Sequence, residues 1–359
     1  MTRLRVEVDE QAIEANARRL VQVLGRSELW AVVKADGYGH GAERCARAAL
    51  RGGATRLGVA TLDEGRELRT ALGEAVPILV LGPLEQGRGG EAHGLELCLS
   101  TPGAGEQLLA EGFRGTVHVK ADTGMGRWGL SLEDALDVGR ALADGELPGL
   151  ALGGLMSHLA VADAADPTFT ALQAARFAEL AAVFPECPRH LANTAGALRH
   201  PGTRFDAARC GIGLYGVAPD DGDATEDGLR AALRVTSDVV SLRTLAPGES
   251  SGYGRRLIAE QPTRVATVPV GYADGYPRAL SGIADVLVRG RRHRVAATVS
   301  MDAFSFVADQ DVAVGDEVVL VGAQGDERIR PEELARLAHT IGYEICCGFR
   351  PRAQRGVAR

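Results

Sequence analysis

Lys34 is the residue of this chain that is best placed to do chemistry. It ends an apolar, strand-like run and leads into a glycine-rich turn, within the segment AVVKADGYGHG of residues 31–41. An amine at the mouth of a packed scaffold has its ammonium form disfavoured by desolvation, so its pKa falls and it can form a Schiff base with a carbonyl compound. The alternative is a lysine at the end of a strand that points into water.

Polar and glycine residues also follow two later strand-like runs. Asn193-Thr194 ends one run, and Arg209 and Gly211-Ile212 lie on and just beyond the next. Barrel enzymes carry their reacting groups at the carboxyl ends of strands and often hold phosphate in the loops after strands seven and eight. The Gly211 and Ile212 amides and the Thr194 hydroxyl are therefore candidates for a phosphate site. A helix cap is the simpler interpretation of Asn193-Thr194.

The elements that must position these residues alternate between strand and helix patterns from residue 9 to residue 228. Such alternation predicts parallel βαβ units, and eight repeats over about 220 residues favour an α/β fold with a closed (β/α)8 barrel over an open sheet. One helix is expected around residues 172–180, with Leu172, Phe177 and Leu180 near one face. The eight strands are predicted at residues 29–35, 56–60, 77–82, 95–100, 116–122, 150–158, 190–194 and 207–216.

A second, smaller domain is expected after the barrel, because 359 residues exceed the usual ceiling of about 250–300 residues for one core. The acidic, loop-rich segment 218–228 is typical of a linker. We expect a barrel domain at 9–228 and a β-rich domain at 229–359, which the strand within residues 1–8 joins. Its strands are predicted at 234–242, 263–270, 285–288, 294–299, 303–307 and 317–321, with a helix at 331–341 that begins with proline.

Composition narrows the class of partner. The net charge is −7, and no basic stripe indicates a nucleic-acid surface. The six cysteines form no C-x-x-C pair and no zinc-site spacing, so we expect reduced thiols and no metal. No apolar run reaches the length of a membrane span, and the N-terminus lacks the apolar core of a signal peptide. We therefore expect a cytoplasmic protein that acts on a small molecule.

Over nearly its whole length the sequence resembles the alanine racemases, which are pyridoxal 5'-phosphate (PLP) enzymes with a barrel domain. Besides 31–41, the resemblance rests on KADTGMGRWG at 120–129, SH at 157–158, SGYGR at 251–255, GYADGY at 271–276 and SMD at 300–302. It implies that Lys34 is the Schiff-base lysine and Tyr253 the second catalytic residue. It further implies that Arg127 and Met301 lie on the substrate side, and that the cofactor contacts Tyr38, His158, Asn193, Thr194, Arg209, Gly211 and Ile212.

Arg209 bears on the mechanism, because the resemblance places it against the pyridine nitrogen. Arginine only donates hydrogen bonds, so the ring nitrogen stays unprotonated and the cofactor is a weaker electron sink. This suits racemisation, which needs one base on each face of the substrate: Lys34 and Tyr253. Tyrosine has an ordinary pKa of about 10 and needs positive charge nearby, for which Arg127 and His158 are candidates.

Two further features follow from the resemblance. In some relatives the lysine that matches Lys120 is carbamylated and pairs with the arginine that matches Arg127. Family members often place a phosphate-contacting tyrosine where this chain has Pro351, so one phosphate contact is expected to be missing. The resemblance also implies a head-to-tail homodimer with shared active sites, and a role in supplying D-alanine for peptidoglycan.

Three alternatives remain open from the sequence. A racemase of another small amino acid, such as serine, would use the same residues. A related barrel-fold decarboxylase is disfavoured, because Arg209 weakens the electron sink that decarboxylation uses. A non-catalytic PLP-binding barrel protein typically lacks the second domain and would not need Tyr253.

Overall fold

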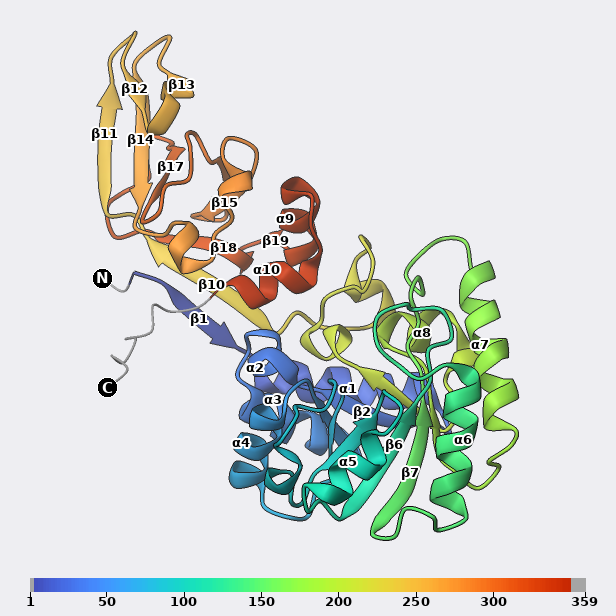
Figure 1. The fold of residues 1–359 in the computed structure, drawn as a ribbon. Coiled ribbons are helices and arrows are strands. Elements are labelled where there is room, and N and C mark those ends of the chain that lie inside the picture. The colour runs from blue at the N-terminus through green and yellow to red at the C-terminus, as the bar shows by residue number, and fades with distance from the viewer. Residues whose placement is uncertain (1–2, 350–359) are drawn as a thin grey trace, which may run out of the picture. The chain divides into compact units, whose positions relative to one another are not determined.

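The structure is a computed structural model that describes residues 3–349. The chain divides into two compact units (Figure 1). The larger comprises Glu10–Asp220 and Ala224–Arg230, and the smaller comprises the N-terminal segment through Asp9, Asp221–Asp223 and the chain from Ala231 onward. The acidic segment 218–228 therefore contributes to both units. Within the described residues no helix is long and apolar enough to cross a membrane.

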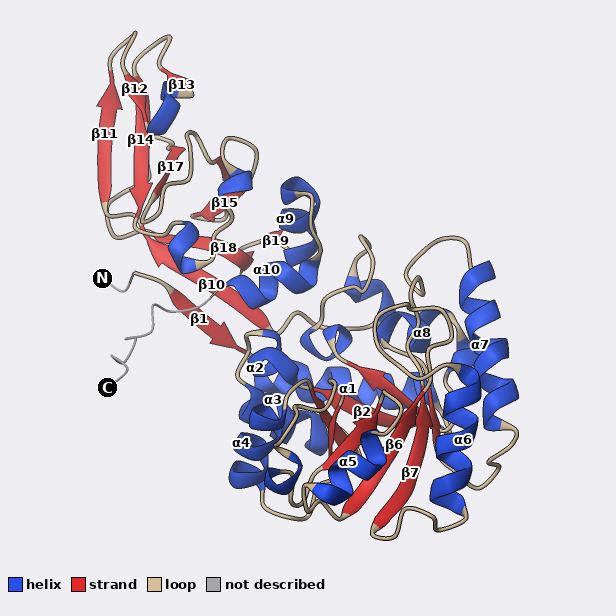
Figure 2. Cartoon of the chain, in the orientation of Figure 1, coloured by secondary structure: helices blue, strands red, loops and turns tan. Residues whose placement is uncertain are grey.

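The larger unit is a closed barrel of eight parallel strands, which confirms the predicted (β/α)8 architecture (Figure 2). The ring closes where β2 pairs with β9, from Glu28 opposite Ala207 to Ala31 opposite Cys210. The strands are β2 (Glu28–Val32), β3 (Arg56–Val59), β4 (Ile78–Val80), β5 (Glu96–Leu99), β6 (Gly115–Lys120), β7 (Leu150–Met156), β8 (Arg189–His190) and β9 (Ala207–Cys210).

Three predicted strands run more than two residues past their observed ends. β2 ends at Val32, so Lys34 lies in a turn and not in the strand. Thr194 begins a helix, and Ile212–Tyr215 form a 3-10 helix beyond β9. In each case the apolar pattern continues past the last ladder hydrogen bond, because the residues that follow the strand are buried or half-buried. Apolar character alone does not distinguish a strand from a buried turn.

Helices cover the outside of the barrel: α1 (Glu10–Leu24), α3 (Ala42–Arg51), α4 (Leu62–Leu72), α5 (Ala104–Ala110), α6 (Leu132–Ala143), α7 (Thr168–Ala181) and α8 (Thr194–Arg199). The predicted face of α7 is partly wrong. Phe177 and Leu180 are buried, but Leu172 is 43% exposed and Gln173 takes the inward position. Gln173 lies four residues before Phe177, on the same side of the helix, whereas Leu172 lies five before it.

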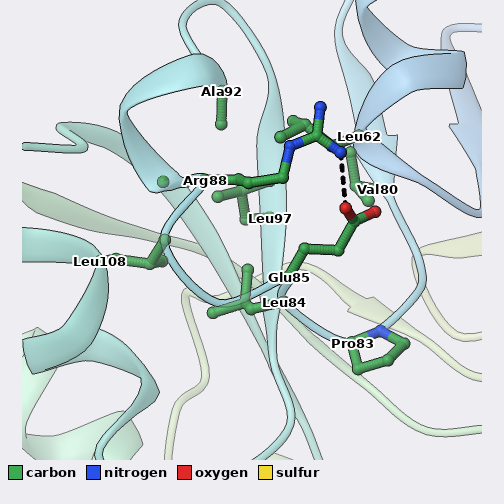
Figure 3. Close-up of a pocket in the computed structure, with 10 residues that line it drawn as sticks. Leu62, Val80, Pro83, Leu84, Glu85, Arg88, Ala92, Leu97 and Leu108 are labelled. Atoms are coloured by element: carbon green, nitrogen blue, oxygen red, sulfur yellow. Dashed lines mark hydrogen bonds and ion pairs between the residues drawn. The ribbon is translucent and has the colours of Figure 1, made fainter. Parts of the chain in front are cut away.

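The connection from β4 to β5 holds only a 3-10 helix, η1 (Gly89–Glu91), in place of a full α-helix. Arg88 before it forms ion pairs with Asp63, Glu85 and Glu91. Under this arginine lies a small hollow with a mainly apolar lining (Figure 3), formed by Leu62, Val80, Pro83, Leu84, Ala92, Leu97 and Leu108. A short, ion-paired segment therefore covers apolar side chains that a helix covers elsewhere in the barrel.

The smaller unit consists of antiparallel sheets with short helices. β1 (Arg5–Val8) pairs with β10 (Leu233–Asp238) in a six-stranded sheet that also contains β15 (Asp285–Val288), β16 (Arg291–Arg294), β18 (Glu317–Gln324) and β19 (Glu327–Ile329). A three-stranded sheet contains β11 (Ser241–Leu245), β14 (Thr263–Val268) and β17 (Phe304–Val307), and β12 (Ser250–Ser251) pairs with β13 (Leu257–Ile258). The 3-10 helices are η5 (Tyr253–Arg255), η6 (Tyr272–Asp274) and η7 (Arg278–Leu280).

Three predictions for this unit are wrong. The single strand predicted at 234–242 is two strands, because β10 ends at Asp238 and β11 begins at Ser241 in the other sheet. The strand predicted at 294–299 is displaced, because β16 ends at Arg294. The helix predicted at 331–341 ends at Ala338, since His339 takes a left-handed conformation with φ of 56°, and a further helix, α10 (Gly342–Gly348), follows α9 (Pro331–Ala338).

Candidate active site

The backbone after Lys34 makes one turn of left-handed helix. Ala35, Asp36, Gly37 and Tyr38 have φ angles of 52°, 53°, 61° and 55°. The left-handed conformation costs roughly 1–2 kcal/mol for each residue other than glycine, and it normally occurs at single positions. Four such residues in succession, three of them not glycine, persist only where the surroundings hold them there.

Side-chain hydrogen bonds hold this left-handed turn. Glu64, on α4, accepts from the Ala35 amide at 2.7 Å through Oε1 and from the Ala60 amide at 2.7 Å through Oε2. The His40 Nδ1–H donates to the carbonyl oxygens of Gly37 and Tyr38, each at 3.0 Å. Burial lowers the pKa of His40 to about 4, so the ring is neutral at physiological pH. The turn that carries Lys34 is thereby fixed from both sides.

The predicted phosphate residues Tyr38, Thr194 and Gly211 meet beside this turn. The Tyr38 hydroxyl lies so close to Gly211 that any Cβ there would collide with it. Thr194 Oγ1 accepts from the Gly211 amide at 3.2 Å and the Gly213 amide at 3.4 Å. The Tyr38 ring packs on Tyr215, with centroids 5.0 Å apart. The result is a tight cradle of backbone amides and hydroxyls at the ends of β8 and β9.

The other two predicted phosphate residues have different surroundings. Asn193 is the N-cap of α8, and its side-chain oxygen accepts from the Gly196 amide at 2.9 Å. Ile212 follows Gly211 directly and begins the 3-10 helix η3 (Ile212–Tyr215). The structure therefore shows a capping role for Asn193, and it places Ile212 next to Gly211 just beyond β9.

Arg209 lies in β9 and is buried. Its Nη1 donates to the His190 carbonyl at 2.5 Å and to His190 Nδ1 at 2.8 Å. Its Nη2 donates to the carbonyls of Ser157 at 2.6 Å and Leu191 at 3.2 Å, and to His158 Nδ1 at 3.3 Å. Burial lowers the pKa of Arg209 to about 10, which still keeps it protonated at neutral pH. The guanidinium is thus a fixed donor held by carbonyl and imidazole groups.

His158 lies within the field of several cations. Burial and the positive charges of Arg209, Arg127, Lys120 and Lys34 hold the pKa of His158 well below its usual range. The barrel thus brings these predicted residues together, and His158 is neutral at physiological pH. This corrects the suggestion that His158 supplies positive charge to the second base, and leaves Arg127 as the candidate.

Two of those cations contact the ring of Trp128. The Arg127 guanidinium lies 3.9 Å and Lys120 Nζ 4.5 Å from the centre of its rings. Burial lowers the pKa of Lys120 to about 8, while Arg127 is exposed. Cation–π contacts of this kind orient both side chains without a carboxylate.

Tyr253 and Met301 belong to the smaller unit, and both are exposed, by 74% and 52%. The Tyr253 carbonyl accepts from Thr298 Oγ1 at 2.8 Å. The amides of Tyr272 and Ala273 donate to the carbonyls of Ser300 and Met301, each at 3.1 Å. The segments 271–276 and 300–302, which the sequence singled out separately, therefore lie side by side.

Sequence reasoning missed three residues that position these groups. Glu64 had a detectable signal, because Thr61 and Glu64 form a capping box at the start of α4. His40 had none beyond its place after the turn. Arg3 ion-pairs with the buried Asp274 at 3.1 Å, and Asp274 accepts from the Gly271 amide at 2.9 Å. Pro351, the position of the expected missing phosphate contact, lies outside the described residues.

Known families match both units. The family described as "Alanine racemase, N-terminal domain" matches residues 8–219, and "Alanine racemase, C-terminal domain" matches residues 232–357. The chain belongs to the alanine racemase family. An alanine racemase of Symbiobacterium thermophilum is 44% identical over 363 residues, which cover 97% of this chain and 95% of that protein. Alanine racemase 1 of Bacillus subtilis is 39% identical over 360 residues, 97% of this chain and 91% of that protein.

Solved structures of the alanine racemase family agree with this fold. The crystal structure of biosynthetic alanine racemase from Pseudomonas aeruginosa has a TM-score of 0.90 and 36% identity, with 100% of each chain covered. The alanine racemase from a D-cycloserine-producing Streptomyces lavendulae has a TM-score of 0.92 and 36% identity, covering 97% of this chain and 95% of that one.

The substitution Glu64→Ala tests whether this carboxylate holds the left-handed turn. It leaves the Ala35 and Ala60 amides without their acceptor, so we expect the free energy of unfolding of the barrel unit to fall by about 1–3 kcal/mol. Both tryptophans, Trp30 and Trp128, lie in that unit, so fluorescence during urea unfolding measures it. The control is Asp63→Ala, which removes an exposed ion pair with Arg88 and should cost clearly less than Glu64→Ala. Equal losses in the two variants would contradict this role of Glu64.

Proposed function

We propose that this protein is a PLP-dependent isomerase that interconverts L-alanine and D-alanine. The observation that carries the proposal is that Lys34, on its stabilised turn, and the buried Arg209 guanidinium lie near one another. The charges of both lower the pKa of His158. Both lie at the carboxyl ends of barrel strands, where barrel enzymes keep their active sites. The names of the relatives support alanine as the substrate.

The residues at these strand ends fit PLP. Lys34 would hold the cofactor covalently through its amine, and Arg209 would face the ring nitrogen as a donor. When bound, PLP stabilises the negative charge left on the α-carbon of an amino acid that loses its proton. The cradle beside the turn offers hydroxyls and backbone amides, which suit a phosphate; its residues are Tyr38, Thr194, Gly211 and Ile212, with Asn193 at its edge.

Two bases carry the proton in this proposal. Lys34 takes or returns the α-proton on one face of the substrate, and Tyr253 does so on the other. Arg127 and Met301 contact the substrate. His158, neutral and hydrogen-bonded to Arg209, lies against the cofactor ring. One base, Lys34, lies on the barrel and the other, Tyr253, on the smaller unit, which suits a reaction that needs a base on each face of the substrate.

The protein acts as a homodimer in this proposal, with each Tyr253 serving the site of the partner subunit. The Tyr253 side chain is 74% exposed within a single chain, which is consistent with a place in a site that a second copy completes. The product would supply D-alanine for peptidoglycan. Serine remains a second candidate substrate, because nothing among these residues tests the size of the side chain that the site accepts.

Lys34→Ala tests the proposal. We expect wild-type protein to racemise L-alanine faster than any other L-amino acid, and Lys34→Ala to lose nearly all of this activity together with the visible absorbance of bound PLP. Lys34 and Lys120 are the only lysines of the chain, so borohydride reduction followed by mass spectrometry identifies the attached amine directly. Lys120→Arg is the control, which should still retain PLP on Lys34. PLP fixed on Lys120 in the wild type, or fastest turnover with serine, would contradict the proposal.

A mixture of two inactive variants tests the shared sites. Lys34→Ala and Tyr253→Ala proteins, allowed to exchange subunits, form heterodimers with one doubly defective site and one intact site. Random pairing makes about half of the dimers mixed, so we expect about a quarter of wild-type activity. Mass spectrometry measures the exchange. If exchange is complete and the mixture stays inactive, Tyr253 does not act across the dimer.

A further inference from the structure

A line of polar side chains crosses the interior of the barrel behind Arg209. Barrel interiors are usually filled by branched apolar residues. Here His190, at the end of β8, is followed by His118 in β6 and by Glu96, the first residue of β5. His190 Nε2 lies 3.0 Å from His118 Nδ1, and His118 Nε2 lies 3.1 Å from Glu96 Oε2. With the 2.8 Å contact of Arg209 and His190 Nδ1, these four side chains form one continuous relay.

The relay has only one consistent direction. A guanidinium donates and cannot accept, so His190 Nδ1 is an acceptor and the ring carries its proton on Nε2. That proton is donated to His118 Nδ1, which leaves the proton of His118 on Nε2, where it is donated to Glu96 at 3.1 Å. Arg56 Nη1, 3.4 Å from the same nitrogen, therefore donates to Glu96 and not to His118. An ionised carboxylate only accepts, so the chain ends there. A second proton on either ring would set two N–H groups against each other.

The charges of these groups agree with that direction. Burial and nearby arginine charges lower the pKa of both His118 and His190, so both rings are neutral. Burial alone would raise the pKa of Glu96, but the hydrogen bond from His118 and the charge of Arg56 outweigh it and lower the pKa. Arg56 reaches the same carboxylate oxygen and stacks on Trp30, with its guanidinium 4.4 Å from the ring centre. The negative end of the relay is therefore fixed in place.

We propose that Glu96, His118 and His190 are positioning residues for Arg209. The relay supplies the buried guanidinium with a counter-charge through two neutral imidazoles, and it fixes one edge of the guanidinium while the other edge bonds Ser157 and Leu191. Arg209 thereby stays charged and keeps one orientation without a carboxylate beside it. The consequence for turnover rests on the proposed function, in which Arg209 faces the cofactor ring.

The test combines a measurement on the wild-type protein with one charge-removing variant. Nitrogen-15 NMR of the histidine rings, with His118→Gln and His190→Gln spectra for assignment, should show both rings neutral and protonated on Nε2 at pH 7. Glu96→Gln keeps the size and an acceptor oxygen but removes the charge. Because charge-assisted hydrogen bonds are roughly twice as strong as neutral ones, we expect kcat for alanine to fall about tenfold while KM changes less than about twofold.

The matched control is Asp238→Asn in the smaller unit. Asp238 also pairs with an arginine, Arg5, and both carboxylates are 15% exposed. The control should keep wild-type kcat. A proton on Nδ1 of either ring, or a kcat for Glu96→Gln that matches the control, would overturn the proposal. If the Glu96 variant does not fold, the wild-type NMR decides. The NMR needs no turnover, so a protein with the expected rings but no racemisation would refute the proposed function and leave the relay standing.

Discussion

The left-handed turn from Ala35 to Tyr38 is the constraint on which the rest of the site depends. Three of its four residues pay a steric cost that only outside contacts can offset. Glu64 binds its first amide, and His40 binds its last two carbonyls. The same turn sets Lys34 at the end of β2 and presses the Tyr38 hydroxyl against Gly211. One piece of strained backbone thus places both the Lys34 amine and one wall of the proposed phosphate cradle.

The second determinant is a group of cations held without carboxylates next to them. Arg209 is bound by carbonyls and imidazoles, and Lys120 and Arg127 lie on the ring of Trp128. Burial, together with the charge of these cations, holds the pKa of His158 well below its usual range and keeps the ring neutral. A site of this kind favours negative charge that develops on a bound substrate, because fixed cations stabilise such charge and the carboxylate of the relay, Glu96, is separated from Arg209 by two imidazole rings. The proposed removal of an α-proton develops such a charge.

The sequence predicted the barrel because the alternation of strand and helix patterns is repeated along the chain, so that one weakly predicted strand does not hide it. It placed Lys34, Thr194, Arg209 and Gly211 at strand ends for the same reason. It did not predict the left-handed turn, since Ala35 and Tyr38 have no intrinsic preference for that backbone and Asp36 adopts it readily only as a single residue. The hydrogen bond from the Ala35 amide to Glu64 joins residues 29 positions apart, and the Arg209 relay joins strands across the barrel. Neither interaction leaves a local pattern in the sequence. Leu172 shows a different error: it is an apolar residue that was predicted to be buried but lies on the exposed side of α7.

Incorporation of deuterium from the solvent tests whether two separate groups remove and return the α-proton. The reaction starts from L-alanine in deuterated water, and the α-position of the first D-alanine formed is analysed by mass spectrometry. If one of the two bases, Lys34 and Tyr253, removes the proton on one face and the other supplies one on the opposite face, that D-alanine carries deuterium and retains none of the original hydrogen. Early D-alanine that retains a substantial share of the original hydrogen would show that a single group removes and returns it, and would contradict the account.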